Sequence, residues 1–321
     1  MSLRGVLARA GVFVVVLGLI AGGGLFVTGS PVSPSPPTVS EDATAPFTGP
    51  DKVVAPSPEN GSLNVEADGD GKVVVVDTAH SGELSRAALT PFTNALVDSG
   101  AEVRYALDDR TRDEPLNTTL AGADAYVVVG QGAAYTNDQL RGIANFTASG
   151  GRVLIVDEPN AGVGGIASLL FGGGRRDTTT RSLAPLASQA GMGFGDGYLY
   201  SVENYDTNYR NVYATPTADG PLTEGVSRTV FHTALPVTGP GVVATSPDTT
   251  VSDTRRQERF TVVARSGNTT VVGDSSVFDP EYLYRADNEV LVSNVLEFLL
   301  TGEKRPADAP GRDSGESRFG A

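Results

Sequence analysis

The chain has 321 residues, a formal net charge of -14 and no cysteine. A negative field of this size repels phosphate groups, which argues against a nucleic-acid partner. The missing cysteine excludes disulfides, thiolate metal sites, cysteine nucleophiles and the lipid-modified cysteine of a lipoprotein anchor.

The basic residues are mostly arginines, since Lys52, Lys72 and Lys304 are the only lysines, and the chain has no tryptophan. With abundant Asp and Glu, this composition is typical of proteins that work in very high salt, where screening removes most of the repulsion between carboxylates. This amino-acid composition resembles that of proteins from salt-loving archaea. An ordinary acidic bacterial protein is the alternative.

Residues 1–29 predict a short cytoplasmic stub and one transmembrane helix, Val6–Val27. This stretch reaches the roughly 20 residues that a helix needs to cross a bilayer. Because Arg4 and Arg9 lie on its N-terminal side, the positive-inside rule places the N-terminus inside the cell and the main domain outside. We therefore expect a single-pass protein of the cell membrane. The alternative is a signal peptide cleaved near Val27-Thr28-Gly29.

Residues 30–70 contain eight prolines among Ser, Thr, Gly and acids, which predicts a disordered tether. The tail, 303–321, is also predicted to be disordered. Four glycosylation sequons agree with an outside location. Their acceptors are Asn60, Asn117, Asn145 and Asn268.

The first half of the folded domain, 71–302, alternates strands with helices. Apolar runs predict strands at 72–77, 101–106, 124–130 and 152–158. Helices are predicted at 85–99 and 138–149, with Thr136 as the N-cap of the second. Such alternation predicts βαβ units around a parallel sheet.

The second half begins with an irregular insertion, about 158–228, in which we expect one helix near 183–190. Strands are predicted at 229–232, 241–245, 260–265 and 269–272, the last two joined by a turn at Ser266-Gly267-Asn268. An amphipathic helix at 287–300 closes the domain, with the pair Asp287-Asn288 as its cap.

Two segments carry a family resemblance. YVVVGQGAAYTNDQLRGIANFTASGGRVLIVDEP is similar to the core of class I glutamine-amidotransferase-like domains. VVGDSSVFDPEYLYRADNEVLVSNVLEFLL resembles the closing segment of a branch with gliding-motility and ABC-transporter auxiliary domains, and with haloarchaeal membrane-anchored proteins. The resemblance covers about 72–301. It implies an α/β, flavodoxin-like three-layer sandwich with a mostly parallel sheet, and partners from MoxR-type ATPase systems.

Candidate site residues follow the strands, because ligands of open α/β sheets bind beyond the carboxyl ends of the strands. A glutaminase of this fold needs a cysteine nucleophile, which excludes that activity here. A Ser-His-Asp substitute could combine His80 with Ser81 or Ser275 and with Asp77 or Asp274. The strand-end candidates are Asp77, Thr78, His80, Gln131, Asp157, Glu158, Asp274 and Ser275.

The strand-end acids Asp77, Asp157, Glu158 and Asp274 could also hold a hard cation. Such acids serve more often as caps of the following loops, so we expect neither a metal nor a cofactor. Asp274 is expected to fix the closing loop.

A tyrosine-rich segment, 198–213, lies inside the predicted insertion and includes Tyr205 and Tyr209. Tyrosine and asparagine favour protein or carbohydrate contacts. Alternatively, these tyrosines cover a sheet edge.

Taken together, the residues favour a non-catalytic extracytoplasmic binding or scaffold domain, part of an envelope or transport-related complex. One alternative is a hydrolase or metal-dependent enzyme that uses the strand-end acids and His80. A solute receptor is a third hypothesis, and it would require a deep pocket.

Overall fold

The computed structural model describes residues 61–81, 88–106, 116–130, 132–159 and 182–304. The predicted membrane helix, the first part of the tether, Asn60, Gln131 and most of the tail lie outside these residues. Within the described ranges, no helix combines the length and the apolar character needed to cross a bilayer.

The fold is mixed α/β around a nine-stranded sheet. Five neighbouring strands are parallel, in the order β2-β1-β3-β4-β13. Their bounds are β1 (Val73–Asp77), β2 (Glu102–Ala106), β3 (Ala125–Val129), β4 (Arg152–Val156) and β13 (Thr269–Val272).

The other half of the sheet is antiparallel and continues from β13 in the order β12-β10-β7-β8. The bounds are β7 (Asn211–Pro216), β8 (Thr229–His232), β10 (Gly241–Thr245) and β12 (Thr261–Ser266). The expectation of a mostly parallel sheet is therefore correct for one half of the sheet, and the complete sheet is mixed.

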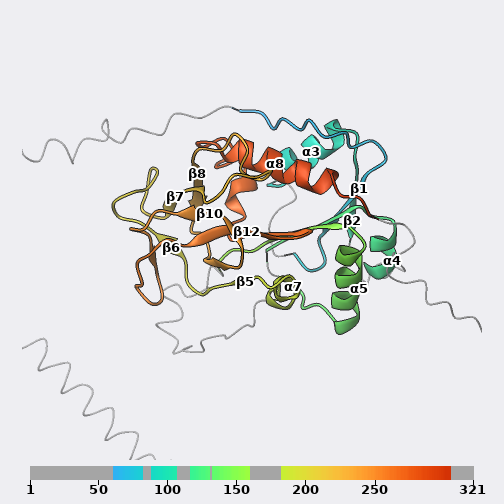
Figure 1. Ribbon diagram of the computed structural model, residues 1–321, viewed down its shortest axis with the longest axis horizontal. Coiled ribbons are helices and arrows are strands. Elements are labelled where there is room, and N and C mark those ends of the chain that lie inside the picture. The colour runs from blue at the N-terminus through green and yellow to red at the C-terminus, as the bar shows by residue number, and fades with distance from the viewer. Residues whose placement is uncertain (1–60, 82–87, 107–115, 131, 160–181, 305–321) are drawn as a thin grey trace, which may run out of the picture. The chain divides into compact units, whose positions relative to one another are not determined.

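Helices cover both faces of the sheet (Figure 1). One face packs against α3 (Thr90–Asp98) and α8 (Asn288–Leu300), and the other against α4 (Leu116–Ala121), α5 (Asn137–Ala148) and α7 (Ala184–Gln189). Alternate residues of one strand face opposite layers, as in β1, where Val74 and Val76 join the α8 side and Val75 the α5 side. The parallel strands are apolar along their whole length because both of their faces are covered.

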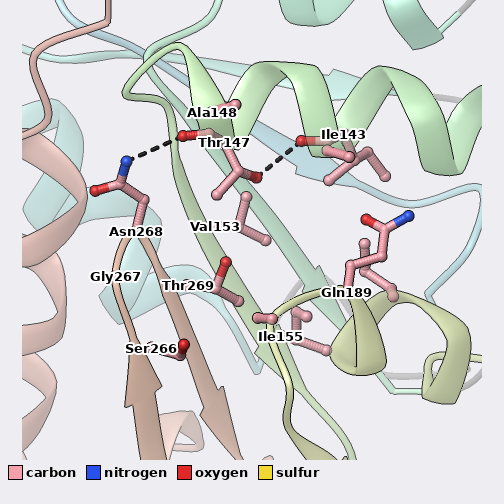
Figure 2. Close-up of a pocket in the computed structure, with 13 residues that line it drawn as sticks. Ile143, Thr147, Ala148, Val153, Ile155, Gln189, Ser266, Gly267, Asn268 and Thr269 are labelled. Atoms are coloured by element: carbon pink, nitrogen blue, oxygen red, sulfur yellow. Dashed lines mark hydrogen bonds between the residues drawn. The ribbon is translucent and has the colours of Figure 1, made fainter.

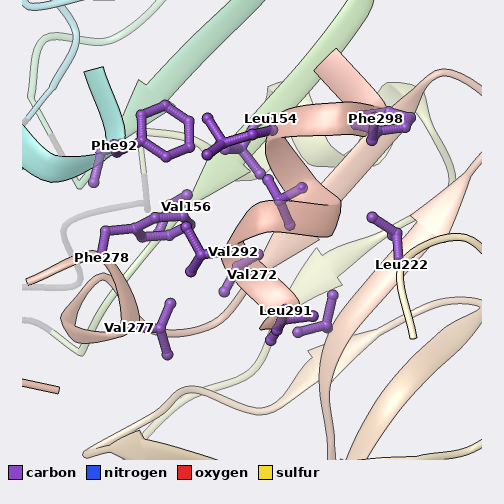
Figure 3. Packing of buried hydrophobic residues seen from close by; sticks show 14 of the residues in the cluster. Phe92, Leu154, Val156, Leu222, Val272, Val277, Phe278, Leu291, Val292 and Phe298 are labelled. Carbon is purple, nitrogen blue, oxygen red and sulfur yellow. The ribbon is translucent and has the colours of Figure 1, made fainter. Parts of the chain in front are cut away.

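The core on the α8 side is built around aromatic contacts (Figure 3). Phe92 of α3 meets Phe278 edge-on, with ring centroids 5.3 Å apart. Val156 and Val272, at the ends of β4 and β13, are buried beneath them. This layer fixes the carboxyl ends of the central strands relative to the chain that follows β13.

Local signals in the sequence located several elements correctly. Thr136 caps α5 in a complete capping box with Gln139, as its position predicts. The β12–β13 hairpin turns through Gly267, whose φ of 56° is left-handed, which suits a glycine.

The described part of the predicted insertion, 182–228, contains more strands than expected. Its residues 211–216 form β7, a strand of the main sheet between β10 and β8. Two small sheets also begin there, where β5 (Gly193–Phe194) pairs with β9 (Val237–Thr238) and β6 (Leu199–Tyr200) with β11 (Thr250–Val251). With Asn, Tyr and Pro among its residues, β7 shows no clear apolar alternation in the sequence. Its pairing with β8 and β10, which follow it in the chain, makes it a strand.

The folded part also begins before the predicted start at residue 71. Leu63, Val65 and Ala67 pack against the core. The backbone N–H of Asn64 donates to Ser293 Oγ on α8 at 3.0 Å. At the other end, Lys304 Nζ donates to the carbonyl of Ala121 at 2.7 Å, so the start of the predicted tail is packed as well.

Candidate functional site

The first polar cluster lies at the end of β1, beside β3, where the strand order reverses and ligands of such sheets bind. Asp77 is fully buried there. Its Oδ1 accepts the backbone N–H groups of Ala79 at 2.8 Å and His80 at 2.9 Å. The loop after β1 therefore folds around this carboxylate.

Side chains complete the cluster on the other oxygen. His80 Nδ1 lies 2.7 Å from Asp77 Oδ2, and the imidazole stacks on Tyr135 with ring centroids 4.1 Å apart. Tyr126, on β3, donates its hydroxyl to the same Oδ2 and lies 2.8 Å from the Tyr135 hydroxyl. The structure thus brings the predicted candidates Asp77 and His80 together and adds two tyrosines that the sequence did not single out.

Electrostatics favour the ionised form of Asp77 and the neutral forms of the two tyrosines. Burial acts to raise the pKa of Asp77, but the hydrogen bond and charge of His80, together with the hydrogen bond from Tyr126, outweigh it and the pKa is lowered. Burial raises the pKa of Tyr126 and of Tyr135 well above the usual value, and the nearby Asp77 adds to this. Asp77 is therefore a stable acceptor, and both tyrosines are fixed donors.

The serine of a possible triad is not aligned with this pair. The Ser81 hydroxyl donates to the backbone carbonyl of Asp77 and accepts the N–H of Val129 at 3.3 Å. Gly132 explains the tight fit, because a Cβ at that position would lie 2.3 Å from the Ser81 carbonyl oxygen. Ser81 joins the loops after β1 and β3 and is not hydrogen-bonded as a nucleophile would be.

The second polar cluster lies at the ends of β4 and β13. Asp274 is buried and accepts Ser276 N at 2.8 Å, Ser276 Oγ at 2.6 Å and His232 N at 2.6 Å. The Ser275 hydroxyl donates to Glu158 Oε2 at 2.5 Å. Burial raises the pKa of Asp274 to about 7 against the effect of its hydrogen bonds, and Glu158 raises it further.

These contacts decide the roles of the remaining candidates. Asp274 fixes the closing loop as expected, while Asp157 is buried and accepts the N–H of Glu158 at 2.9 Å. Thr78 donates to the carbonyl of Ala106 at 2.8 Å. Across the described ranges, no three His, Asp or Glu side chains gather in a way that could hold a metal ion.

The pair Asp287-Asn288 corrects another expectation. Asp287 makes no side-chain cap to α8, and its Oδ2 instead accepts the N–H groups of Ser227 and Arg228. Asn288 is buried and bonds both the N–H and the carbonyl of Val230 at 2.9 Å. The pair therefore satisfies the outer edge of β8, which the sequence could not show without the strand order.

A cavity of about 280 Å³ lies at the opposite end of the strands, between α5, α7 and the β12–β13 hairpin (Figure 2). Val153 and Ile155 form part of its apolar wall. Asn268, on its rim, donates to the Thr147 carbonyl at 3.0 Å and accepts Arg152 at 2.8 Å. None of the strand-end candidates that the structure describes lines this cavity.

The tyrosine-rich segment is exposed in its middle part, 202–210, whereas Tyr198, Tyr200 and Tyr213 are partly buried. Val202 is 69% exposed, and Tyr205 and Tyr209 are each 43% exposed. Tyr205 bridges to Val212 of β7, so the segment leads directly into the edge region of the sheet. If these side chains covered a sheet edge, they would be buried. Their exposure therefore favours the alternative that they form a surface for contact with another molecule.

Comparison with solved structures supports the α/β fold. The chain is similar to the mmIFT52 N-terminal domain, with a TM-score of 0.54 and 12% identity over 72% of this chain and 99% of that one. A Bacteroides uniformis protein described as ThuA-like gives a TM-score of 0.45 and 12% identity, over 77% of this chain and 99% of that one. The glutaminase domain of Trypanosoma brucei CTPS gives a TM-score of 0.29 and 7% identity, over 68% of this chain and 94% of that one.

The sequence comparisons give the family. No curated protein matches the chain significantly. One family model matches residues 92–296, a stretch that begins within α3, ends within α8 and contains Asp274, Asp287 and Asn288. The match spans more than half of the chain, so the protein belongs to the family described as Domain of unknown function (DUF4350).

Proposed function

We propose that this protein is a non-catalytic binding or scaffold domain of an envelope or transport-related complex. Residues 6–27 hold it in the membrane, with the N-terminus inside and the main domain outside. The observation that carries the proposal is the exposed tyrosine-rich segment, with Val202, Tyr205 and Tyr209 open to solvent. Tyrosine is enriched among the residues that dominate protein interfaces.

The polar clusters support a structural use of the strand-end acids. Asp77 accepts hydrogen bonds on both oxygens, and Asp274 holds the N–H of His232 and the hydroxyl of Ser276. The hydroxyl of Ser275 is directed to Glu158. These groups are occupied in holding loops, which leaves recognition to the surface.

We also propose the finer fold and origin that the resemblance implies: a class I glutamine-amidotransferase-like, flavodoxin-like sandwich from a salt-loving archaeon. The order β2-β1-β3-β4-β13 of the parallel strands is the flavodoxin-like order, and it supports this assignment. Components of a MoxR-type ATPase system are the proposed partners.

The test is a pull-down of the full-length tagged chain from native membranes in high salt, with the partner quantified by mass spectrometry. One protein should be recovered in near-equal amount, and His80→Ala should recover as much. A pull-down that yields no stable partner would contradict the proposal.

A hydrolase is the second candidate, favoured by the 2.7 Å contact between Asp77 and His80, the geometry of an acid that orients a catalytic imidazole. The full chain would be assayed with p-nitrophenyl acetate. Turnover above the buffer rate that His80→Ala abolishes would favour the enzyme, whereas no turnover, or equal turnover by the variant, would dismiss it.

A further inference from the structure

We infer that the tyrosine-rich segment and the loop at 252–257 form one recognition surface for carboxylates of an acidic protein segment. This inference rests on the proposed function and names the surface and the chemistry of the partner. The surface, here called the tyrosine–arginine face, consists of Tyr198, Tyr200, Tyr205, Tyr209, Arg210 and Arg255.

The face is built by alternating cations and rings. Arg210 lies over Tyr198 and Tyr209, 5.0 and 5.5 Å from the two ring centroids, and donates Nε to the Tyr209 hydroxyl at 3.1 Å. Arg255 donates Nη1 to the Tyr200 hydroxyl at 2.8 Å. Each guanidinium is thus held in place before any ligand arrives, which lowers the entropy cost of binding.

Two separate parts of the chain are joined in this face. Tyr200 pairs with Thr250 in the small sheet of β6 and β11, which brings the loop with Arg255 beside the tyrosines. Tyr200 and Tyr209 also meet edge-on, with centroids 6.1 Å apart. The arrangement is therefore a defined surface and not a set of independent loop side chains.

The charges of the face indicate the ligand. Two neighbouring acids are already paired with other arginines: Asp206 with Arg285 at 2.5 Å and Glu258 with Arg256 at 3.0 Å. Among the described residues, Arg210 and Arg255 take part in no ion pair, although the chain has 38 acids against 24 basic residues. A guanidinium offers a planar fork that matches a carboxylate in a bidentate pair.

Backbone strain supports a role for Arg255 itself. Its φ is 57°, in the left-handed region, where a non-glycine residue costs about 1–2 kcal/mol. Glycine would fit the turn more easily. Strained residues cluster at ligand clamps and active sites, and Thr207 of the tyrosine-rich segment also has a positive φ, of 33°.

The same features favour a protein partner. The net charge of -14 opposes polyphosphates. Guanidiniums lie against Tyr198, Tyr200 and Tyr209, whose faces a sugar ring would need. Val202 and Tyr205 beside them add exposed apolar surface, so the best fit is a segment that combines carboxylates with an apolar side chain.

The probe is the peptide Glu-Glu-Phe-Glu-Glu, added to the full-length chain in detergent and followed by tyrosine fluorescence, which is readable because the chain has no tryptophan. Saturable binding should weaken with salt and fall roughly tenfold or more in the double variant Arg210→Ala/Arg255→Ala. Arg141→Ala is the matched control, since Arg141 is an exposed arginine on α5, and it should bind normally.

The inference is overturned if the peptide does not bind, if Gln-Gln-Phe-Gln-Gln binds equally, or if the double variant binds like the control. Arg255→Gly separates recognition from folding: it should lose peptide binding while its melting temperature stays equal or rises. A lower melting temperature would indicate a structural arginine and contradict the assignment.

The two proposals fail separately. A partner that the double variant still recovers from native membranes would overturn this face and leave the scaffold function standing. If the peptide binds but no partner is recovered from membranes, the tyrosine–arginine face stands and the scaffold function is contradicted.

Discussion

Two buried carboxyl groups, Asp77 and Asp274, differ in their electrostatics. The pKa of Asp77 is lowered because hydrogen bonds outweigh burial, whereas burial raises the pKa of Asp274 to about 7. Asp77 therefore stabilises the fold above its unfolded pKa and loses that contribution in acid. Asp274 has the opposite sign, since the folded state must bury its charge at high pH.

Asp274→Asn tests this difference. As the pH rises from about 4 to 7, Asp274 should lower the free energy of unfolding of the wild type with a slope of up to about 1.4 kcal/mol per unit. The asparagine variant should lack this contribution. Urea unfolding of both proteins across this range measures the difference between their free energies of unfolding. Burial lowers the pKa of His232, which gives the opposite pH dependence, but His232 is present in both proteins and its effect cancels in the difference. Parallel profiles for the two proteins would contradict the assignment.

For single residues, the sequence predicts where a side chain lies in the fold better than it predicts the partner that the side chain bonds. Acids that follow parallel strands must gather at one edge of the sheet, so Asp77, His80 and Asp274 could be singled out. The phenols of Tyr126 and Tyr135 could not, because Tyr126 reads as one more apolar residue of a buried strand. Its contact with Asp77 depends on the pairing of β1 with β3.

At the scale of the elements, β8 obtains several of its hydrogen bonds from side chains. It ends the sheet, and Asn288 bonds Val230 N and O on the side away from β7. The same Nδ2 donates to the carbonyl of Tyr282 at 2.9 Å. One buried amide thus ties the edge strand to the start of α8.

Asn288→Ala should lower the free energy of unfolding by about 3 kcal/mol, because buried backbone groups lose their partners. Asn294→Ala is the matched control on the same helix. Its amide bonds the carbonyls of Leu222 and Glu224 in a more exposed setting, and its loss should cost about 1 kcal/mol. Chemical denaturation measures both, and equal losses would count against a special role for Asn288.

The helix itself was predictable within one residue, because its apolar spacing is a local signal. The role of Asp287-Asn288 was not. An acid and an amide at a helix start usually cap it, and nothing in the sequence indicates an unpaired strand edge beside them.

Over the whole molecule, the alternation of strands and helices predicted four of the five parallel strands, and β13 was predicted as a strand but not as a member of the parallel half. In the antiparallel half, β8, β10 and β12 were predicted as strands, with a turn that joins β12 to β13, but β7 was not predicted. Its order comes from long-range pairing, and β7 carries no clear apolar alternation.

The proposed outside location gives a further prediction for the sequons. Asn145 is exposed on α5, whereas the amide of Asn268 is bonded on both sides and Asn117 packs against Gly142. If the folded protein carries a glycan on these positions, mass spectrometry should find it on Asn145, and Asn145→Gln should remove it. A glycan on Asn268 would contradict the structure, because the amide nitrogen that would carry it is bonded to the carbonyl of Thr147.

The closed edge of β8 also limits how this protein can associate. An unpaired strand edge is a template on which another chain can add a strand, either as a ligand or as the start of an aggregate. Asp274, Asp287 and Asn288 occupy the backbone groups that such a strand would need. A partner at this end of the sheet must therefore bind through side chains. Asn288→Ala would free the backbone groups of Val230, and another strand could then pair with this edge and begin a fibril.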